Sequence, residues 1–74
     1  MATQKQNDTM DAIRNNILQK GYVILSQGTD RIGHDRKQIM LHITYEHRLH
    51  PEYCAWWIVG PRGAIRESSP NAIL

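Results

Sequence analysis

The sequence predicts a small α+β domain, with one N-terminal helix packed on an antiparallel β-meander of three to four strands. Three observations predict this class: a segment with helical apolar spacing near the N-terminus, a strictly alternating segment mid-chain, and Gly- and Pro-containing turns between apolar runs. A chain of 74 residues has room for a single domain with a small core.

The helix is expected at about residues 9–20, where apolar side chains recur at helical spacing. These side chains are Met10, Ile13, Ile17 and Leu18. Asp8 or Thr9 is placed to cap the start of the helix, and Gly21 is suited to a left-handed stop at its end. Residues 1–8 show no apolar period before the helix and are expected to form a disordered lead.

The strands are expected at residues 22–27, 38–46, 54–59 and, as a short returning strand, 64–67. In the second of these segments, apolar side chains alternate with polar ones, so His42 and Thr44 should face away from the core. The run from Cys54 to Val59 is continuously apolar, and a short helix begun at Pro51 is the alternative to a strand there.

The remaining segments are expected to be irregular. Residues 28–37 are polar and contain two glycines, which is typical of a mobile loop. The sequence Gly60-Pro61 starts a tight turn. The folded domain should therefore span residues 9–67, and residues 68–74 should form a flexible C-terminal tail.

Composition narrows the classes of function. A single cysteine excludes a disulfide within one chain and indicates a reducing compartment. No apolar run approaches the roughly 18 residues needed to cross a bilayer, and the N-terminus does not resemble a signal peptide, so a cytoplasmic protein is expected. A chain this short has few residues to line a pocket of about 300 Å³ or more, so no small-molecule substrate and no cofactor are expected.

Catalysis and metal binding are both disfavoured by the pattern of reactive residues. Cys54 and a nearby histidine form the minimum for a thiolate–imidazole pair, but no third group orients the base, so the protein is not expected to be an enzyme. His47, His50 and Cys54 are ligand types that zinc accepts, yet they form one loose pair rather than the two paired motifs of structural zinc sites. No metal is therefore expected, with ordinary surface histidines and a small buried cysteine as the simpler interpretation.

A basic surface is the basis of one alternative function. In a meander, the loop after the first strand and the turn after the third lie at the same end of the sheet. Arg31, Arg36, Lys37 and Arg62 would share that end, and Arg48 would lie at the opposite one. Such a surface suits a weakly basic nucleic-acid-binding module or regulator, or an acidic partner, although Asp30 and Asp35 interrupt the first loop and Glu67 follows the last turn.

The favoured hypothesis is contact with a protein. If residues 54–59 form a strand, one tryptophan enters the core and the other lies on the open face of the sheet. That open face would hold Trp56, Ile58, Met40 and His42. Exposed patches of this kind mark interfaces. The chain is therefore expected to be a small non-catalytic binding protein, acting as a homodimer, an adaptor, or an inhibitor or regulator of a larger complex, of the size common among mobile-element accessory proteins.

Overall fold

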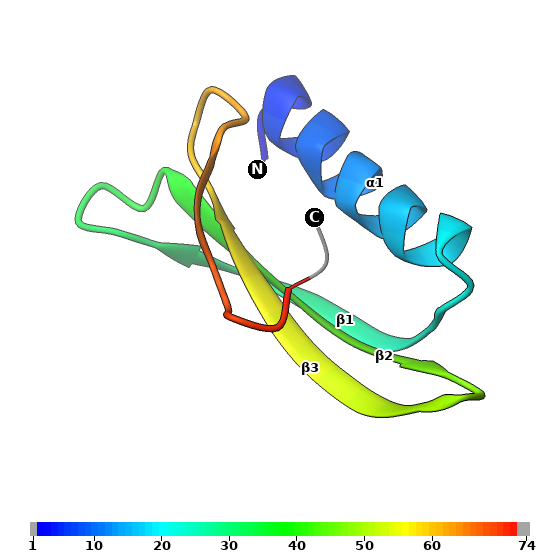
Figure 1. The fold of residues 1–74 in the computed structure, drawn as a ribbon. Coiled ribbons are helices and arrows are strands. Elements are labelled where there is room, and N and C mark those ends of the chain that lie inside the picture. Colours follow the sequence, from blue (N-terminus) through cyan, green and yellow to red (C-terminus); the bar gives the residue numbers. More distant parts are fainter. Residues whose placement is uncertain (1, 73–74) are drawn as a thin grey trace.

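The computed structural model describes residues 2–72, apart from the side chains of residues 50 and 51, and shows one helix packed on a four-stranded antiparallel sheet (Figure 1). The helix is α1 (Gln4–Gln19), and the strands are β1 (Val23–Ile32), β2 (Gln38–His47), β3 (His50–Val59) and β4 (Ile65–Ser68). The order of strands in the sheet follows the chain, β1-β2-β3-β4. The predicted α+β class is confirmed.

The helix begins earlier than its apolar spacing predicts. Thr3 is its N-cap, and its hydroxyl accepts a hydrogen bond from the backbone N–H of Gln6 at 3.1 Å. The Gln6 side chain accepts in return from the backbone N–H of Thr3 at 3.0 Å, which completes a capping box. The described part of the segment predicted as a disordered lead is therefore capped and helical, while Met1 lies outside the described residues.

The end of the helix follows the prediction. Gly21 adopts a left-handed conformation with φ of 88°, which a residue with a Cβ atom rarely adopts. Its N–H donates to the carbonyl of Leu18, and that of Tyr22 donates to the carbonyl of Ile17. The chain then turns directly into β1.

The core lies between α1 and one face of the sheet. Its buried side chains are Met10, Ile13, Ile17, Ile39, Leu41, Ile43, Tyr45, Ala55, Trp57 and Val59. Each large apolar side chain buried this way contributes roughly 1.5–3 kcal/mol. Leu18, predicted as part of the helical stripe, is instead 52% exposed.

Two strands extend further than predicted. Residues 28–32 pair with β2, so the predicted loop 28–37 is reduced to residues 33–37. β1 is an edge strand, and polar side chains are tolerated there because water reaches them. β3 is a strand and not a helix, and it starts at His50. Pro51 lies beside an irregularity in the β2–β3 register and beyond the residues of β3 that pair with β4, where a missing N–H is tolerated.

The described part of the predicted flexible tail, residues 68–72, lies against the sheet. Ser69 is buried, and it exchanges two hydrogen bonds with the backbone of Trp56, at 2.9 and 3.1 Å. The hydroxyl of Tyr45 donates to the carbonyl of Asn71 at 3.1 Å. Residues 73 and 74 of that prediction lie outside the described residues. Within the described part of the chain, no helix is long and apolar enough to cross a membrane.

Candidate functional site

The sheet has an outer face that looks away from α1 (Figure 1). On this face Met40 of β2 lies directly opposite Ile58 of β3, and His42 lies directly opposite Trp56. Residues that pair across two strands point to the same side of a sheet. The residues predicted as protein-binding candidates thus form two adjacent cross-strand pairs, and we call these four residues the outer patch.

Burial differs sharply between the two tryptophans. Trp57 is fully buried in the core, paired with Leu41, whereas Trp56 points to the outer face and is half-buried. Met40 and Ile58 are also half-buried, and His42 is exposed. The outer patch therefore offers apolar surface that is partly shielded by its own neighbours and still accessible to a partner.

Carboxylates flank the apolar pair of the outer patch. Met40 is paired with Asp30 of β1 on one side, and Ile58 is paired with Glu67 of β4 on the other. These four residues form one row across the sheet, and the backbones of its two acidic ends are roughly 14 Å apart at a strand spacing of about 4.8 Å. Both carboxylate residues are exposed. The patch is an apolar surface with an acidic border.

His42 reaches toward the edge of the sheet. A Cβ atom built on Gly28, its partner in β1, would lie 2.6 Å from Cε1 and 2.8 Å from Nε2 of the imidazole. The ring therefore lies directly over the backbone of β1, with its Nε2 3.8 Å from Oδ2 of Asp30. This position adds an imidazole nitrogen to the polar border of the patch.

Of the metal-ligand candidates, the side chains of Cys54 and His47 are described, and they lie in different surroundings. Cys54 is exposed, not buried as expected, and lies on the outer face with Thr44, whose hydroxyl is 3.8 Å from its sulfur. His47 instead packs on Tyr22, with ring centroids 5.5 Å apart, and accepts a hydrogen bond from the N–H of Leu49. The side chain of His50 lies outside the described residues. No three His, Cys, Asp or Glu residues of the described part of the chain are grouped to hold a metal ion.

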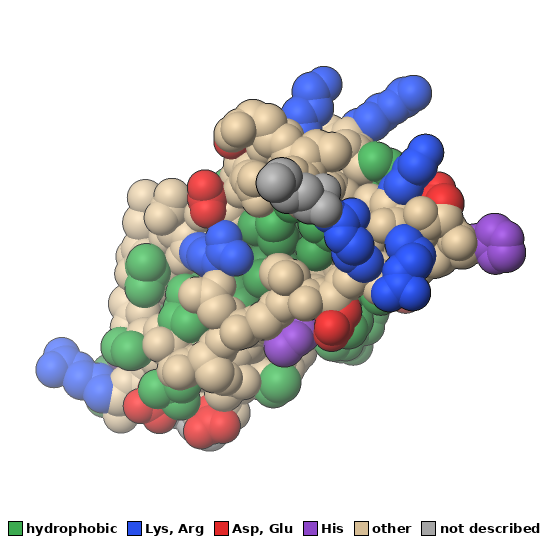
Figure 2. Space-filling view, turned by 180° about the vertical axis from the view of Figure 1, so that it is seen from behind, with side chains coloured by type: hydrophobic (Ala, Val, Ile, Leu, Met, Phe, Trp, Pro, Cys, Tyr) green, Lys and Arg blue, Asp and Glu red, His purple; other side chains and the backbone are tan. Residues whose placement is uncertain are grey.

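The basic candidates divide between the two ends of the sheet. Arg31, at the end of β1, and Arg36 and Lys37, in the loop that follows, lie at the same end as Arg62 in the β3–β4 turn. Arg48 lies in the β2–β3 turn at the opposite end. In Figure 2, most Lys and Arg side chains gather at one end of the molecule.

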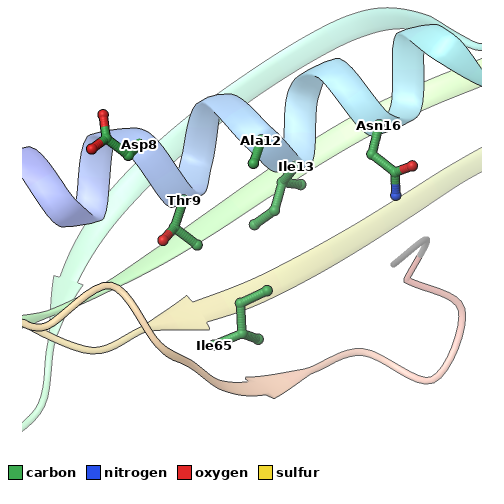
Figure 3. Close-up of a pocket in the computed structure, with 6 residues that line it drawn as sticks. All are labelled: Asp8, Thr9, Ala12, Ile13, Asn16 and Ile65. Atoms are coloured by element: carbon green, nitrogen blue, oxygen red, sulfur yellow. The ribbon is translucent and has the colours of Figure 1, made fainter.

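An open groove of about 480 Å³ between α1 and β4 was not predicted. In Figure 3, Ile13 from the helix and Ile65 from the strand point into it. Its other lining residues are Asp8, Thr9, Ala12 and Asn16. Ile65 is 42% exposed because the helix covers the first three strands and leaves β4 aside. The groove offers apolar contact together with the carboxylate of Asp8 and the hydroxyl of Thr9.

Comparison of the chain with models of protein families, with curated proteins and with solved structures gave no match. A small α+β fold hosts many functions, so function has to be argued from the surfaces of this chain.

Proposed function

We propose that the chain is a small non-catalytic binding protein that docks a basic protein surface on its outer patch. The observation that carries the proposal is the row Asp30, Met40, Ile58 and Glu67, with Trp56 beside it. An apolar centre bordered by carboxylates complements a partner that presents an apolar side chain between two cations. A protein of this kind acts as an adaptor or as an inhibitor of a larger complex.

The energetics favour Trp56 as the anchor. Tryptophan is enriched among residues whose truncation lowers affinity by 2 kcal/mol or more. Trp56 is held in the ladder between β2 and β4, because its backbone N–H and carbonyl both bond to Ser69 and it pairs with His42. Because its backbone is already ordered, Trp56 loses little backbone freedom on binding, so more of the contact energy appears as affinity.

The charge of the border argues against a second copy as the partner. In the rows of the outer patch, among the described residues, the formally charged side chains are Asp30 and Glu67, and both are acidic. Two copies docked face to face would bring carboxylates toward carboxylates, and like charges across an interface disfavour association. A basic partner is attracted by the same border.

Affinity capture from the cell of origin tests the proposal. Nuclease is added so that no protein is captured only because nucleic acid links it to the bait. Three baits are compared: the unchanged chain, Trp56→Ser, and Leu49→Ser, which alters a 76% exposed leucine in the β2–β3 turn. The proposal requires a partner that the unchanged chain and the Leu49→Ser control retain and the Trp56→Ser variant loses. Equal retention by all three baits would place the interface elsewhere.

Charge reversal tests the chemistry of the border. The double variant Asp30→Lys/Glu67→Lys should lower affinity for the captured partner by about tenfold or more, because attraction becomes repulsion. The control Asp8→Lys/Asp11→Lys makes the same change in net charge on exposed positions of α1. An equal loss in both variants would show that net charge, rather than the outer patch, governs binding.

A further inference from the structure

Lys and Arg side chains are concentrated at one end of the molecule (Figure 2). Of the nine in the chain, six lie where the β1–β2 loop, the β3–β4 turn and the first turn of α1 meet. They are Lys5, Arg31, Arg36, Lys37, Arg62 and Arg66. We call this set the basic end.

The carboxylates at and beside the basic end neutralise only part of its positive charge. Two carboxylates lie there, Asp35 and Asp8, and two more, Asp30 and Glu67, directly adjoin Arg31 and Arg66, so three of the seven lie elsewhere with the remaining three Lys and Arg. Asp35 accepts a hydrogen bond from the backbone N–H of Lys37 at 3.1 Å, and Asp8 accepts one from the side chain of Gln4 at 2.8 Å. Among the described residues, the ion pairs within 4.0 Å involve other side chains, Arg14 with Asp11 and His42 with Asp30. With these four carboxylates counted, the side chains at this end carry a net charge of about +2, and those of the rest of the chain carry a net charge of about zero.

Hydrogen bonds fix the loops of the basic end to the helix. The hydroxyl of Thr3 donates to the carbonyl of Pro61 at 3.2 Å, and the Gln6 amide donates to the carbonyl of Lys37 at 2.8 Å. The hydroxyl of Thr9 donates to the carbonyl of Gly63. Within the β1–β2 hairpin, the Arg31 guanidinium donates to the carbonyl of Arg36 at 3.3 Å. The cations are thus presented by a fixed backbone, which lowers the entropy lost when they bind a ligand.

The tyrosines and tryptophans lie away from this end. Tyr22, Tyr45 and Tyr53 pack on one another, with ring centroids 5.2 to 6.3 Å apart, toward the β2–β3 turn. Trp57 is buried in the core, and Trp56 is on the outer face. Proteins that bind single strands use several aromatic side chains to stack successive bases, whereas the ring at the basic end is the imidazole of His34, exposed in the β1–β2 loop, and the Tyr and Trp side chains lie elsewhere.

We infer that the basic end binds the phosphate backbone of a double-helical nucleic acid without reading its sequence. Arginine and lysine neutralise phosphates and release counterions, and this interaction needs no access to the bases. The site is separate from the outer patch, so the inference goes beyond the proposed protein contact and does not depend on it.

Binding of a labelled DNA duplex of mixed sequence, followed by fluorescence anisotropy at increasing salt, tests the inference. If about four phosphates are contacted, affinity should fall roughly 100-fold between about 50 and 200 mM salt. The triple variant Arg31→Gln/Arg36→Gln/Lys37→Gln should bind weakly and reduce the salt slope by roughly 2 to 3. An RNA duplex in a parallel titration shows which double helix is preferred.

The control variant is Arg14→Gln/Lys20→Gln/Arg48→Gln, which removes the same number of positive charges outside the basic end. It should bind the duplex within about twofold of the unchanged chain at equal salt, because net charge alone does not govern the contact. Equal loss in the two triple variants, or no duplex binding at low salt, would overturn the inference. Binding of a single strand or of polyglutamate as tight as that of the duplex would overturn it as well. Trp56→Ser should leave duplex binding unchanged, so failure of the proposed protein contact is distinguished from failure here.

Discussion

The imidazole of His42 occupies the space above Gly28 where a side chain would otherwise stand. A Cβ atom at position 28 would come within 2.6 Å of the ring, and the two residues are direct partners across β1 and β2. The glycine inside a strand, which first indicates a loop, is there because the neighbouring strand places a ring over it. The pair also sets where His42 lies in the border of the outer patch.

Gly28→Ala and His42→Ala are therefore expected to be coupled. With His42 present, the methyl group added at position 28 displaces the imidazole ring, and the ring's packing over β1 is lost. This loss offsets the stability gained because alanine lowers the conformational entropy of the unfolded chain. In the His42→Ala background the clash is absent, so Gly28→Ala should stabilise the fold by about 0.5–1 kcal/mol. Urea unfolding of the two single variants and the double variant measures the coupling free energy. Additive effects would show that the ring does not lie over Gly28.

The two tryptophans should differ in their effect on stability. Trp57 is fully buried, so Trp57→Ala should lower the free energy of unfolding by about 3–5 kcal/mol, enough to unfold much of a small domain. Trp56→Ala should lower it by less than about 1.5 kcal/mol, because the side chain is half-buried and its backbone hydrogen bonds remain. Circular dichroism during thermal unfolding compares the two, and a larger loss for Trp56→Ala would reverse the assignment of faces.

Trp57→Phe separates apolar packing from the indole nitrogen. Nε1 of Trp57 is buried without a hydrogen-bond partner among the described residues. Its removal relieves a desolvation penalty of about 1–3 kcal/mol, which offsets part of the cavity left by the smaller ring. Trp57→Phe should therefore be much milder than Trp57→Ala in the same unfolding experiment. Equal destabilisation by the two substitutions would show that a phenyl ring recovers none of the packing at this position.

Gln6 should behave as a structural residue although it is polar. It is 1% exposed, accepts from the N–H of Thr3, and donates to the carbonyl of Lys37. Gln6→Glu keeps the acceptor but sets a carboxylate against a carbonyl, so a loss of about 2–4 kcal/mol is expected. Asn7→Asp, the same chemical change on an exposed neighbour, should cost less than about 0.5 kcal/mol. Similar midpoints in urea for the two variants would argue against a buried Gln6.

Stability should fall at alkaline pH because of Tyr45. Burial raises the pKa of its hydroxyl above the ordinary value of 10.0, and the neighbouring Tyr22 and Tyr53 raise it further. The folded chain therefore holds this proton more tightly than the unfolded chain. The stability that this provides is present below about pH 10 and is lost as the pH rises toward the raised value.

Tyr45→Phe tests this dependence. It removes the bond to the Asn71 carbonyl, so the unchanged chain should be about 1 kcal/mol more stable near neutral pH. The difference between the two proteins should narrow above about pH 10, as the tyrosine of the unfolded chain ionises. Urea unfolding at several pH values measures it. A difference that stays constant through the alkaline range would show that the hydroxyl titrates alike in both states.

The parts of the fold that the sequence predicts are those with a strong period. Alternation in residues 38–46 predicts which face of β2 is buried, and the structure buries Ile39, Leu41 and Ile43 as expected. The same alternation carried into residues 54–59 separates Trp56 from Trp57 correctly. These segments are central in the sheet and bury one face, so the register leaves a clear pattern.

The parts that it does not predict depend on polar contacts between distant segments. The first turns of α1 lack apolar spacing, but Thr3 and Gln6 have the capping-box spacing, which was a usable signal. The second half of β1 lies in an edge strand, and its side chains are polar. Together with Gly28, this polarity makes the segment resemble a loop in the sequence. Residues 68–72 are held by hydrogen bonds from Trp56 and Tyr45. Such contacts between distant segments leave no periodic pattern in the local sequence.

The same distinction applies to the surfaces. The pairing of Met40 with Ile58 and of His42 with Trp56 follows from alternation once a meander is assumed. The acidic border of the outer patch cannot be predicted in this way, because it depends on the register of β1 and of β4 across the sheet. Lys5 joins the basic end because the helix starts early, and this start depends on the cap at Thr3.

Hydroxyl-radical footprinting of the unchanged chain, free and bound to its captured protein partner, shows directly which surface the partner covers. Oxidation of Trp56, Met40 and Ile58 is read by mass spectrometry, with Leu49, 76% exposed in the β2–β3 turn, as the internal control. The partner should protect these three residues of the outer patch and leave Leu49 reactive. A bound partner that leaves Trp56 and Met40 as reactive as in the free chain would contradict docking on the outer patch.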